Sequence, residues 1–133
     1  MPIEVEWFVP RRVILQRFYG EITLEDIRQS DELIEPLMAE GIPLIHTIID
    51  ASEVESHPSM KDIQNAATNT KYEGEGWRVL VGAGAIARFI GSIILQLMGQ
   101  RYRMYDTLEE AVAFLHDQDP SIELPDSFTR TGT

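Results

Sequence analysis

The sequence contains no cysteine, and this absence excludes disulfides, thiol nucleophiles and cysteine-ligated metal sites. Basic residues are also scarce, with 11 Lys and Arg against 22 Asp and Glu, so the formal net charge is −11 at pH 7. Because nucleic-acid binding requires a basic surface, we expect no nucleic-acid partner. The longest apolar stretch, residues 86–98, is too short to span a bilayer, and the N-terminus lacks the basic start of a signal peptide. We therefore expect no transmembrane segment and a cytoplasmic location.

One segment lacks acidic residues altogether. Residues 76–105 contain four arginines and no Asp or Glu, so all 22 acids lie in the rest of the chain. Taken singly, each arginine could pair with a surface acid, which contributes at most about 1 kcal/mol. Taken together in an acid-free segment, the arginines indicate a binding site for an anionic small molecule or lipid. They are Arg78, Arg88, Arg101 and Arg103.

The hydrophobic pattern predicts one α/β domain over residues 1–118. With 133 residues, 44% of them apolar, the chain is long enough to bury a core. We expect strands near residues 3–7, 12–19, 44–50, 77–81 and 102–105, and helices at residues 24–40, 58–69, 85–98 and from 107 onward. Strands that alternate with helices predict a single mixed, mainly parallel sheet with an N-terminal β-hairpin and about four helices. Residues 119–133 are acidic and contain proline, and we expect them to form a flexible tail.

Four segments between about Arg12 and His116 carry a resemblance to a known fold. They read RVILQRFYGEITLEDI, PLIHTIIDASEV, WRVLVG and YRMYDTLEEAVAFL. Their order and hydrophobic pattern resemble the STAS fold, in particular the SpoIIAA-like (STAS/SEC14-type) bacterial families. The resemblance implies a small, non-enzymatic, cytoplasmic domain: an anti-sigma-factor antagonist, a sensor, or a regulatory module that binds nucleotides, lipids or other proteins.

The resemblance also directs attention to the serines after the third strand. In anti-sigma-factor antagonists of this type, a serine in a D-S-x-G-type motif at the start of the second helix is phosphorylated. The corresponding stretch here, residues 50–60 (DASEVESHPSM), contains no glycine, and its serines are displaced. Ser56 and Ser59 are the candidate phosphorylation sites, and capping of the helix start is the alternative role for both.

Residues 82–87 (GAGAIA) match the pattern G-x-G-x-x-A between an expected strand and an expected helix. Such glycines let a pyrophosphate approach, and the free amides of the first helical turn bind its charge. Asp106 stands where the ribose-binding acid of a dinucleotide site would stand. Because a single β-α-β unit remains after this turn, a dinucleotide-binding enzyme is our third hypothesis, and a sharp turn is the simpler role of the glycines. The anion-binding residues that we expect are Gly82, Ala83, Gly84, Arg88, Arg101 and Arg103.

We predict no catalytic residues, no metal site and no cofactor. The three histidines are far apart, and none has the spacing of a zinc site. His46 lies within an expected central strand, where we expect a hydrogen-bonded core or half-buried residue. No serine stands in a G-x-S-x-G nucleophile elbow. These observations favour a protein that is not an enzyme.

The expected helix at residues 85–98 has more apolar surface than a helix on a single sheet needs. At about 100° per residue, its apolar residues cover an arc of roughly 240°, more than twice what a surface helix buries. One part of the arc should face the sheet, and the other should contact a second copy of the chain. The interface residues that we expect are Ala87, Gly91, Ile94, Leu95 and Met98. Our leading hypothesis is therefore a regulatory, protein-binding module that forms a homodimer, with the anionic-ligand site as the alternative.

Overall fold

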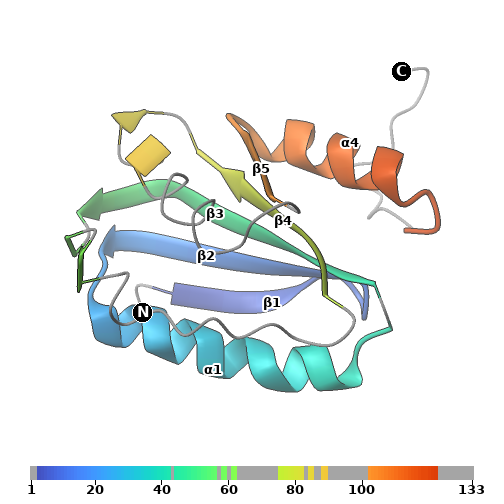
Figure 1. Ribbon diagram of the computed structural model, residues 1–133, viewed down its shortest axis with the longest axis horizontal. Helices are drawn as coiled ribbons and strands as arrows, with labels where there is room; N and C mark the ends of the chain where they lie inside the picture. Colours follow the sequence, from blue (N-terminus) through green and yellow to red (C-terminus); the bar gives the residue numbers. More distant parts are fainter. Residues whose placement is uncertain are drawn as a thin grey trace.

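The computed structural model describes residues 3–42, 44–56, 58, 59, 61, 62, 75–82, 84, 85, 88, 89 and 102–122. In this part of the chain, a five-stranded sheet lies between two helices (Figure 1). The strands are β1 (Ile3–Val9), β2 (Val13–Glu21), β3 (Ile45–Ser56), β4 (Glu75–Val81) and β5 (Tyr102–Tyr105). The helices are α1 (Leu24–Glu40) and α4 (Leu108–Gln118).

The strands lie in the sheet in the order in which they occur in the chain, β1-β2-β3-β4-β5. β1 and β2 form an antiparallel hairpin, whereas β2–β3, β3–β4 and β4–β5 pair in parallel. The expected single mixed sheet with an N-terminal hairpin is therefore confirmed. The hairpin turn holds Arg11 at φ 65°, a left-handed conformation that residues other than glycine seldom adopt. Of the helices expected, α1 and α4 are described, and those at residues 58–69 and 85–98 lie mainly outside the described residues.

β3 is longer than the sequence pattern predicted. The strand continues to Ser56, whereas the prediction ended at Asp50. The polar sequence after Asp50 is typical of a loop, but Ala51 and Val54 are buried, and the parallel pairing with β2 continues to the end of both strands. β4 likewise begins at Glu75, before its expected start. Pairing with neighbouring strands, rather than local hydrophobicity, sets these strand ends.

α1 begins at a capping box formed by Thr23 and Asp26. The Thr23 hydroxyl accepts from the Asp26 main-chain N–H at 3.2 Å, and the Thr23 N–H donates to the Asp26 carboxylate at 2.9 Å. The helix continues through Pro36 and is followed by Gly41, whose φ of −76° is not left-handed. A Cβ on Gly41 would lie 2.5 Å from Ile45 Cδ1. Close packing against β3, and not backbone conformation, therefore requires glycine at the end of α1.

Alternate residues of the central strands face opposite layers. On the α1 face, Ile14 and Ile45 pack with Ile34 and Met38 of the helix. The α1 face also carries a second cluster, which consists of Ile22, Ile49, Ala51, Val54, Leu80 and Tyr102, with Phe18 and Ile27 packed against it. The α4 face carries the largest cluster, which consists of Val9, Val13, Leu15, Ile48, Val79, Val81, Ala111, Val112, Leu115 and Ile122.

The chain stays packed against the sheet beyond α4. Ile122 is 2% exposed and belongs to the same cluster as Val13 and Leu115. These three side chains, together with other apolar residues of β1, β3 and α4, line a small cavity. The packed part of the chain thus extends past the expected domain boundary at residue 118, because Ile122 completes the core on the α4 face. Residues 123–133, the rest of the expected tail, lie outside the described residues.

Candidate functional site

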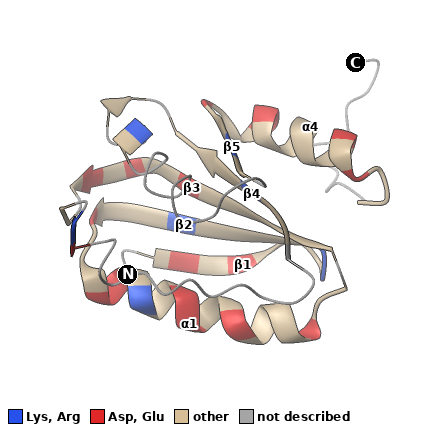
Figure 2. Cartoon of the chain, viewed as in Figure 1, with Lys and Arg blue, Asp and Glu red and all other residues tan. Residues whose placement is uncertain are grey.

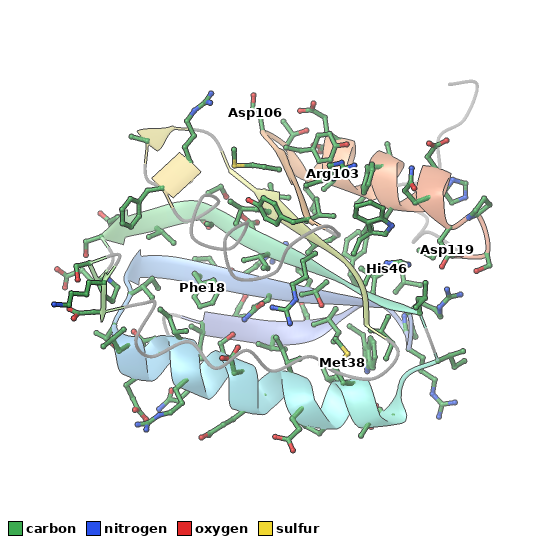
Figure 3. The ribbon with its side chains drawn as sticks, viewed as in Figure 1. Phe18, Met38, His46, Arg103, Asp106 and Asp119 are labelled. Atoms are coloured by element: carbon green, nitrogen blue, oxygen red, sulfur yellow. The ribbon has the colours of Figure 1, made fainter. Side chains whose placement is uncertain are left out.

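A buried histidine on β3 has the geometry that most resembles a functional centre. His46 is 1% exposed and lies on the α4 face, with Asp119 beside it (Figure 3). Its Nδ1 accepts a hydrogen bond from the Trp77 main-chain N–H at 2.9 Å, and its Nε2 lies 3.1 Å from Asp119 Oδ2. Because Nδ1 is the acceptor, Nε2 carries the proton of the neutral ring and donates it to the Asp119 carboxylate.

Asp119 is held by donors from three parts of the chain. Besides His46, Arg12 Nη2 lies 2.6 Å from Asp119 Oδ2, and the Ser121 hydroxyl donates to Oδ1 at 2.5 Å. The hydrogen bond from Ser121 contributes most to lowering the pKa of Asp119 to about 2; burial opposes it, and His46 and Arg12 lower the pKa further. Arg12 also donates to the main-chain oxygen of Leu44 at 3.3 Å. An ionised carboxylate at neutral pH thus ties the start of β2 and the start of β3 to the segment after α4.

A His–Asp pair also forms part of many hydrolytic triads, but His46 has no ring nitrogen left for that chemistry. A general base must accept a proton on the ring nitrogen that faces away from the carboxylate. In His46 that atom is Nδ1, which already accepts from the main chain of Trp77. The prediction of a hydrogen-bonded core or half-buried residue is therefore confirmed, with His46 in the core, and we interpret its contacts as structural.

Three residues of this arrangement were missed by the sequence analysis. A Cβ on Gly76 would lie 2.6 Å from His46 Cε1, so this glycine makes room for the imidazole. Arg12 and Asp119 are 107 residues apart, and no local pattern connects them. The available signal was a single histidine within the apolar run of β3, which indicates that partners exist but does not identify them.

The glycine turn after β4 has the backbone conformation that the sequence predicts. Gly82 and Gly84 have φ angles of 148° and 99°, in the region that favours glycine. The Gly82 N–H donates to the Tyr105 oxygen at 3.0 Å, and the Arg88 N–H donates to the Gly84 oxygen at 3.1 Å, which starts a helical turn. The space around a Cβ at Gly84 is open to 4 Å. Ala83 lies outside the described residues.

The described arginines of the acid-free segment are not gathered in one place (Figure 2). Arg103 lies beside α4, with its guanidinium 4.9 Å from the Trp77 ring centroid and 5.8 Å from that of Phe114. Arg78 occupies the alternate position on β4, on the α1 face, and its charge acts on Asp31 of α1. The sheet therefore separates Arg78 from Arg103. Arg88 is exposed, and Arg101 lies outside the described residues.

The two candidate phosphorylation sites differ in their surroundings. Ser56 is the last residue of β3, and its main-chain oxygen accepts from the Ile22 N–H at 2.9 Å, so it does not begin a helix as expected. The Ser59 hydroxyl accepts from the Asp62 N–H at 3.1 Å, which is the geometry of an N-terminal cap. Of these two serines, Ser59 therefore has the capping role that the sequence analysis named as the alternative to phosphorylation.

The residues of the expected dimer interface all lie outside the described residues: Ala87, Gly91, Ile94, Leu95 and Met98. Within the described residues, no group of three or more His, Asp or Glu side chains could hold a metal ion. The same part of the chain contains no helix that is both long and apolar enough to cross a membrane.

No protein-family model and no curated protein matches the sequence. The fold does match solved structures. An uncharacterized protein of the DUF3478 family from Shewanella loihica PV-4, described as having a SpoIIAA-like fold, is 18% identical with a TM-score of 0.58, over 85% of this chain and 91% of that one. The anti-sigma factor antagonist SpoIIAA in its unphosphorylated form is 17% identical with a TM-score of 0.55. The match covers 86% of this chain and 97% of that one. The phosphorylated Bacillus cell fate determinant SpoIIAA is 17% identical with a TM-score of 0.51. The match covers 85% of this chain and 98% of that one. The chain therefore has a SpoIIAA-like fold, as the sequence resemblance implied.

Proposed function

We propose that this chain is a non-enzymatic regulatory module that works by binding a protein partner. The observation that supports this most directly is the SpoIIAA-like fold, which is shared over 86% of the chain with an anti-sigma factor antagonist. The buried His46–Asp119 pair is consistent with this proposal, because its ring nitrogens are used to hold the fold together. A module that binds a protein partner does so through its surface, so we look for the partner there.

The simplest partner is a second copy of the chain. The sequence supports a contact through one face of the apolar segment at residues 85–98, where Ile94 and Met98 lie beside smaller residues. A glutamate on that face would place a charge in an apolar interface. We expect the double variant Ile94→Glu, Met98→Glu to be a folded monomer and the unmodified chain to be a dimer at about 50 micromolar.

Size-exclusion chromatography with light scattering measures both states. Leu33→Glu is the matched control, because Leu33 is also a large apolar residue, lies 45% exposed on α1, and is not part of the apolar segment at residues 85–98. We expect it to remain dimeric. A monomeric unmodified chain at the same concentration would show that self-association is wrong.

A second candidate function is the binding of a small anion at the glycine turn. The backbone of Gly84 is open to approach, and the helical turn that begins there contains Arg88, whose side chain is exposed. We expect pyrophosphate to raise the melting temperature of the unmodified chain and to lose this effect in Arg88→Gln. Saturable binding of NAD at the same turn would instead support the third hypothesis, a dinucleotide enzyme.

A further inference from the structure

β1 forms an open edge of the sheet. The strand order places it beside β2, and no other described strand pairs with its outer side (Figure 1). Main-chain N–H and C=O groups on the outer side of an edge strand can pair with a further strand. Residues 3–7 keep an unbroken register with β2, and the irregularity in register follows Trp7. β5, at the opposite edge, has four residues against seven in β1. β1 is therefore the edge better suited to accept a strand.

An apolar surface continues from the α1 face of β1 onto α1 itself. Val5 and Trp7 are half-buried there and pack with Leu37 against the core. Trp7 Nε1 also donates to Glu40 Oε1 at 3.3 Å. At about 100° per residue, Leu33 lies on the same flank of the helix as Leu37 and Glu40, and it is 45% exposed. A strand added beside β1 would therefore bring its own side chains onto this apolar flank.

The opposite face of β1 is acidic. Glu4 and Glu6 alternate with the apolar residues of the strand, so both carboxylates stand on the α4 face, and both side chains are exposed (Figure 2). Glu4 accepts a hydrogen bond from Tyr19 Oη at 2.7 Å. Glu6 takes part in no ion pair within the described part of the chain. The edge strand thus offers negative charge on one face and apolar contact on the other.

The same two carboxylates argue against a second copy of the chain as the added strand. An antiparallel pair of β1 strands centred on any residue from 4 to 6 would set a glutamate of one copy directly opposite a glutamate of the other. Like charges in that position destabilise a strand pair, and each copy carries a net charge of −11. A strand with Lys or Arg at alternate positions would instead face Glu4 and Glu6 with opposite charge.

We propose that β1 binds an extended segment of another protein by adding it to the sheet, and that this segment alternates basic and apolar side chains. Its main chain would pair with the outer side of β1. Its basic side chains would face Glu4 and Glu6, and its apolar side chains would pack on Trp7 and Leu33. The inference rests on the proposed protein-binding function and names a surface other than residues 85–98, so a failed dimer experiment would leave it standing.

The probe is a capped heptapeptide, Lys-Val-Lys-Val-Lys-Val-Lys, which matches the seven residues of β1. Calorimetry on the full chain at physiological salt should show saturable binding. The order Lys-Lys-Lys-Lys-Val-Val-Val keeps the composition and loses the alternation, so this control should bind roughly tenfold more weakly. Equal affinity for the two peptides would show attraction to the acidic chain as a whole and would overturn the proposal. Absence of saturable binding would overturn it as well.

Main-chain pairing can be tested on the peptide itself. Successive amides of an extended strand point to opposite sides, so N-methylation of the valines blocks one edge of the peptide and N-methylation of the lysines blocks the other. At least one of these half-methylated peptides should retain binding through its free edge. A peptide methylated at every nitrogen keeps the same side chains and should lose binding. Retained binding by the fully methylated peptide would exclude pairing with β1 and overturn the proposal.

Matched variants of the protein locate the peptide. Leu33→Ser and Glu6→Gln each remove one expected contact and should weaken heptapeptide binding roughly fivefold. Met104→Ser and Glu109→Gln are comparable changes at exposed positions on β5 and α4, and they should alter the affinity by less than about twofold. Equal effects from the two pairs of variants would show that the peptide does not bind at β1.

Tryptophan fluorescence gives a readout at β1 itself. The chain has two tryptophans, and Trp77 lies against Phe114 of α4, on the opposite face of the sheet from the apolar flank of β1. Binding of the heptapeptide should shift the emission of the unmodified chain and of Trp77→Phe, but not that of Trp7→Phe. A shift that persists in Trp7→Phe would place the peptide elsewhere and overturn the proposal.

Discussion

At the scale of single residues, the structure depends on a histidine whose two ring nitrogens perform different tasks. His46 Nδ1 accepts from the Trp77 main chain, and Nε2 donates to Asp119. The imidazole fits only because position 76 has no side chain. Gly76 makes no hydrogen bond to this network but leaves the space that the imidazole occupies. A side chain at position 76 should therefore disturb the hydrogen bonds of His46 to Trp77 and Asp119.

Gly76→Ala tests this interpretation. The added methyl group would overlap the imidazole of His46, and overpacking of this kind costs about 1–3 kcal/mol of the free energy of unfolding. Urea denaturation measures the loss. In the His46→Ala background the obstacle is gone, so Gly76→Ala should cost much less there. An equal cost in both backgrounds would assign the effect to the β4 backbone instead.

At the scale of elements, a buried polar contact joins α1 to the sheet within an apolar interface. The Gln16 amide on β2 donates to the Ser30 hydroxyl on α1, and both residues are buried, at 6% and 0% exposure. Apolar contacts with Ile34 and Met38 hold the helix to the sheet without specifying its position along the strand. The Gln16–Ser30 bond adds a directional constraint, because it forms only when the two side chains face each other.

Ser30→Ala should therefore destabilise the protein more than the loss of one hydroxyl suggests. It leaves the buried Gln16 amide without this acceptor, which costs about 1–3 kcal/mol. Combining it with Gln16→Leu removes both polar partners and should recover part of the loss in urea denaturation. If the double variant is as unstable as the sum of the two single variants, the two side chains are not coupled.

At the scale of the whole molecule, Asp119 connects the end of the described chain to its beginning. Its carboxylate contacts Arg12 before β2 and His46 on β3, and Ile122 follows it into the core. The segment after α4 thus covers the α4 face of the sheet and is held there by an ion pair. Stability should consequently depend on the charge of this single carboxyl group.

The pH dependence of unfolding tests that connection. The pKa of Asp119 is about 2 in the folded protein, below its ordinary value of 3.8, so the ionised form favours folding. Its contribution, on the order of 2 kcal/mol, is present above about pH 4 and disappears as the pH falls through about 2. The difference in unfolding free energy between the unmodified chain and Asp119→Asn should shrink over that range. Ser121→Ala removes the largest cause of the lowered pKa and should move the transition to higher pH; an unchanged transition would contradict this assignment.

Much of the fold could be predicted from local patterns, because hydrophobic alternation and capping residues act within a few positions. The hairpin and the extent of α1 were predicted correctly, and His46 is the core residue of the two alternatives, core or half-buried, that the sequence allowed. The end of β3 was not predicted, since Ala51 and Val54 are buried in the apolar cluster with Ile22 while the strand stays paired with β2, and neither contact shows in the local pattern.

The candidate sites were harder to predict than the fold, because they depend on which face each residue takes. Arg78 and Arg103 belong to one acid-free segment, but the sheet separates them. Each strand alternates between two faces, and the pairing register that relates one strand to the next is a property of the folded sheet. For the same reason, no spacing in the sequence indicates that Arg78 pairs with Tyr102 on the neighbouring strand.

The five strands lie in the sheet in the same order as they occur in the chain, and this order has a consequence for synthesis of the chain. Each new strand pairs with the one made just before it, so the sheet can grow from β1 to β5 as residues leave the ribosome. Arg12 and His46 belong to the early part of this process, yet their shared carboxylate arrives only after α4 has been made. A nascent chain that stops before Asp119 would hold a buried imidazole without the acceptor for its Nε2–H and a guanidinium without its counter-charge. Such a chain should be cleaved by proteases and bound by chaperones until Asp119 has been added after α4. Formation of the Asp119 contacts would then make the newly synthesised domain resistant to proteolysis.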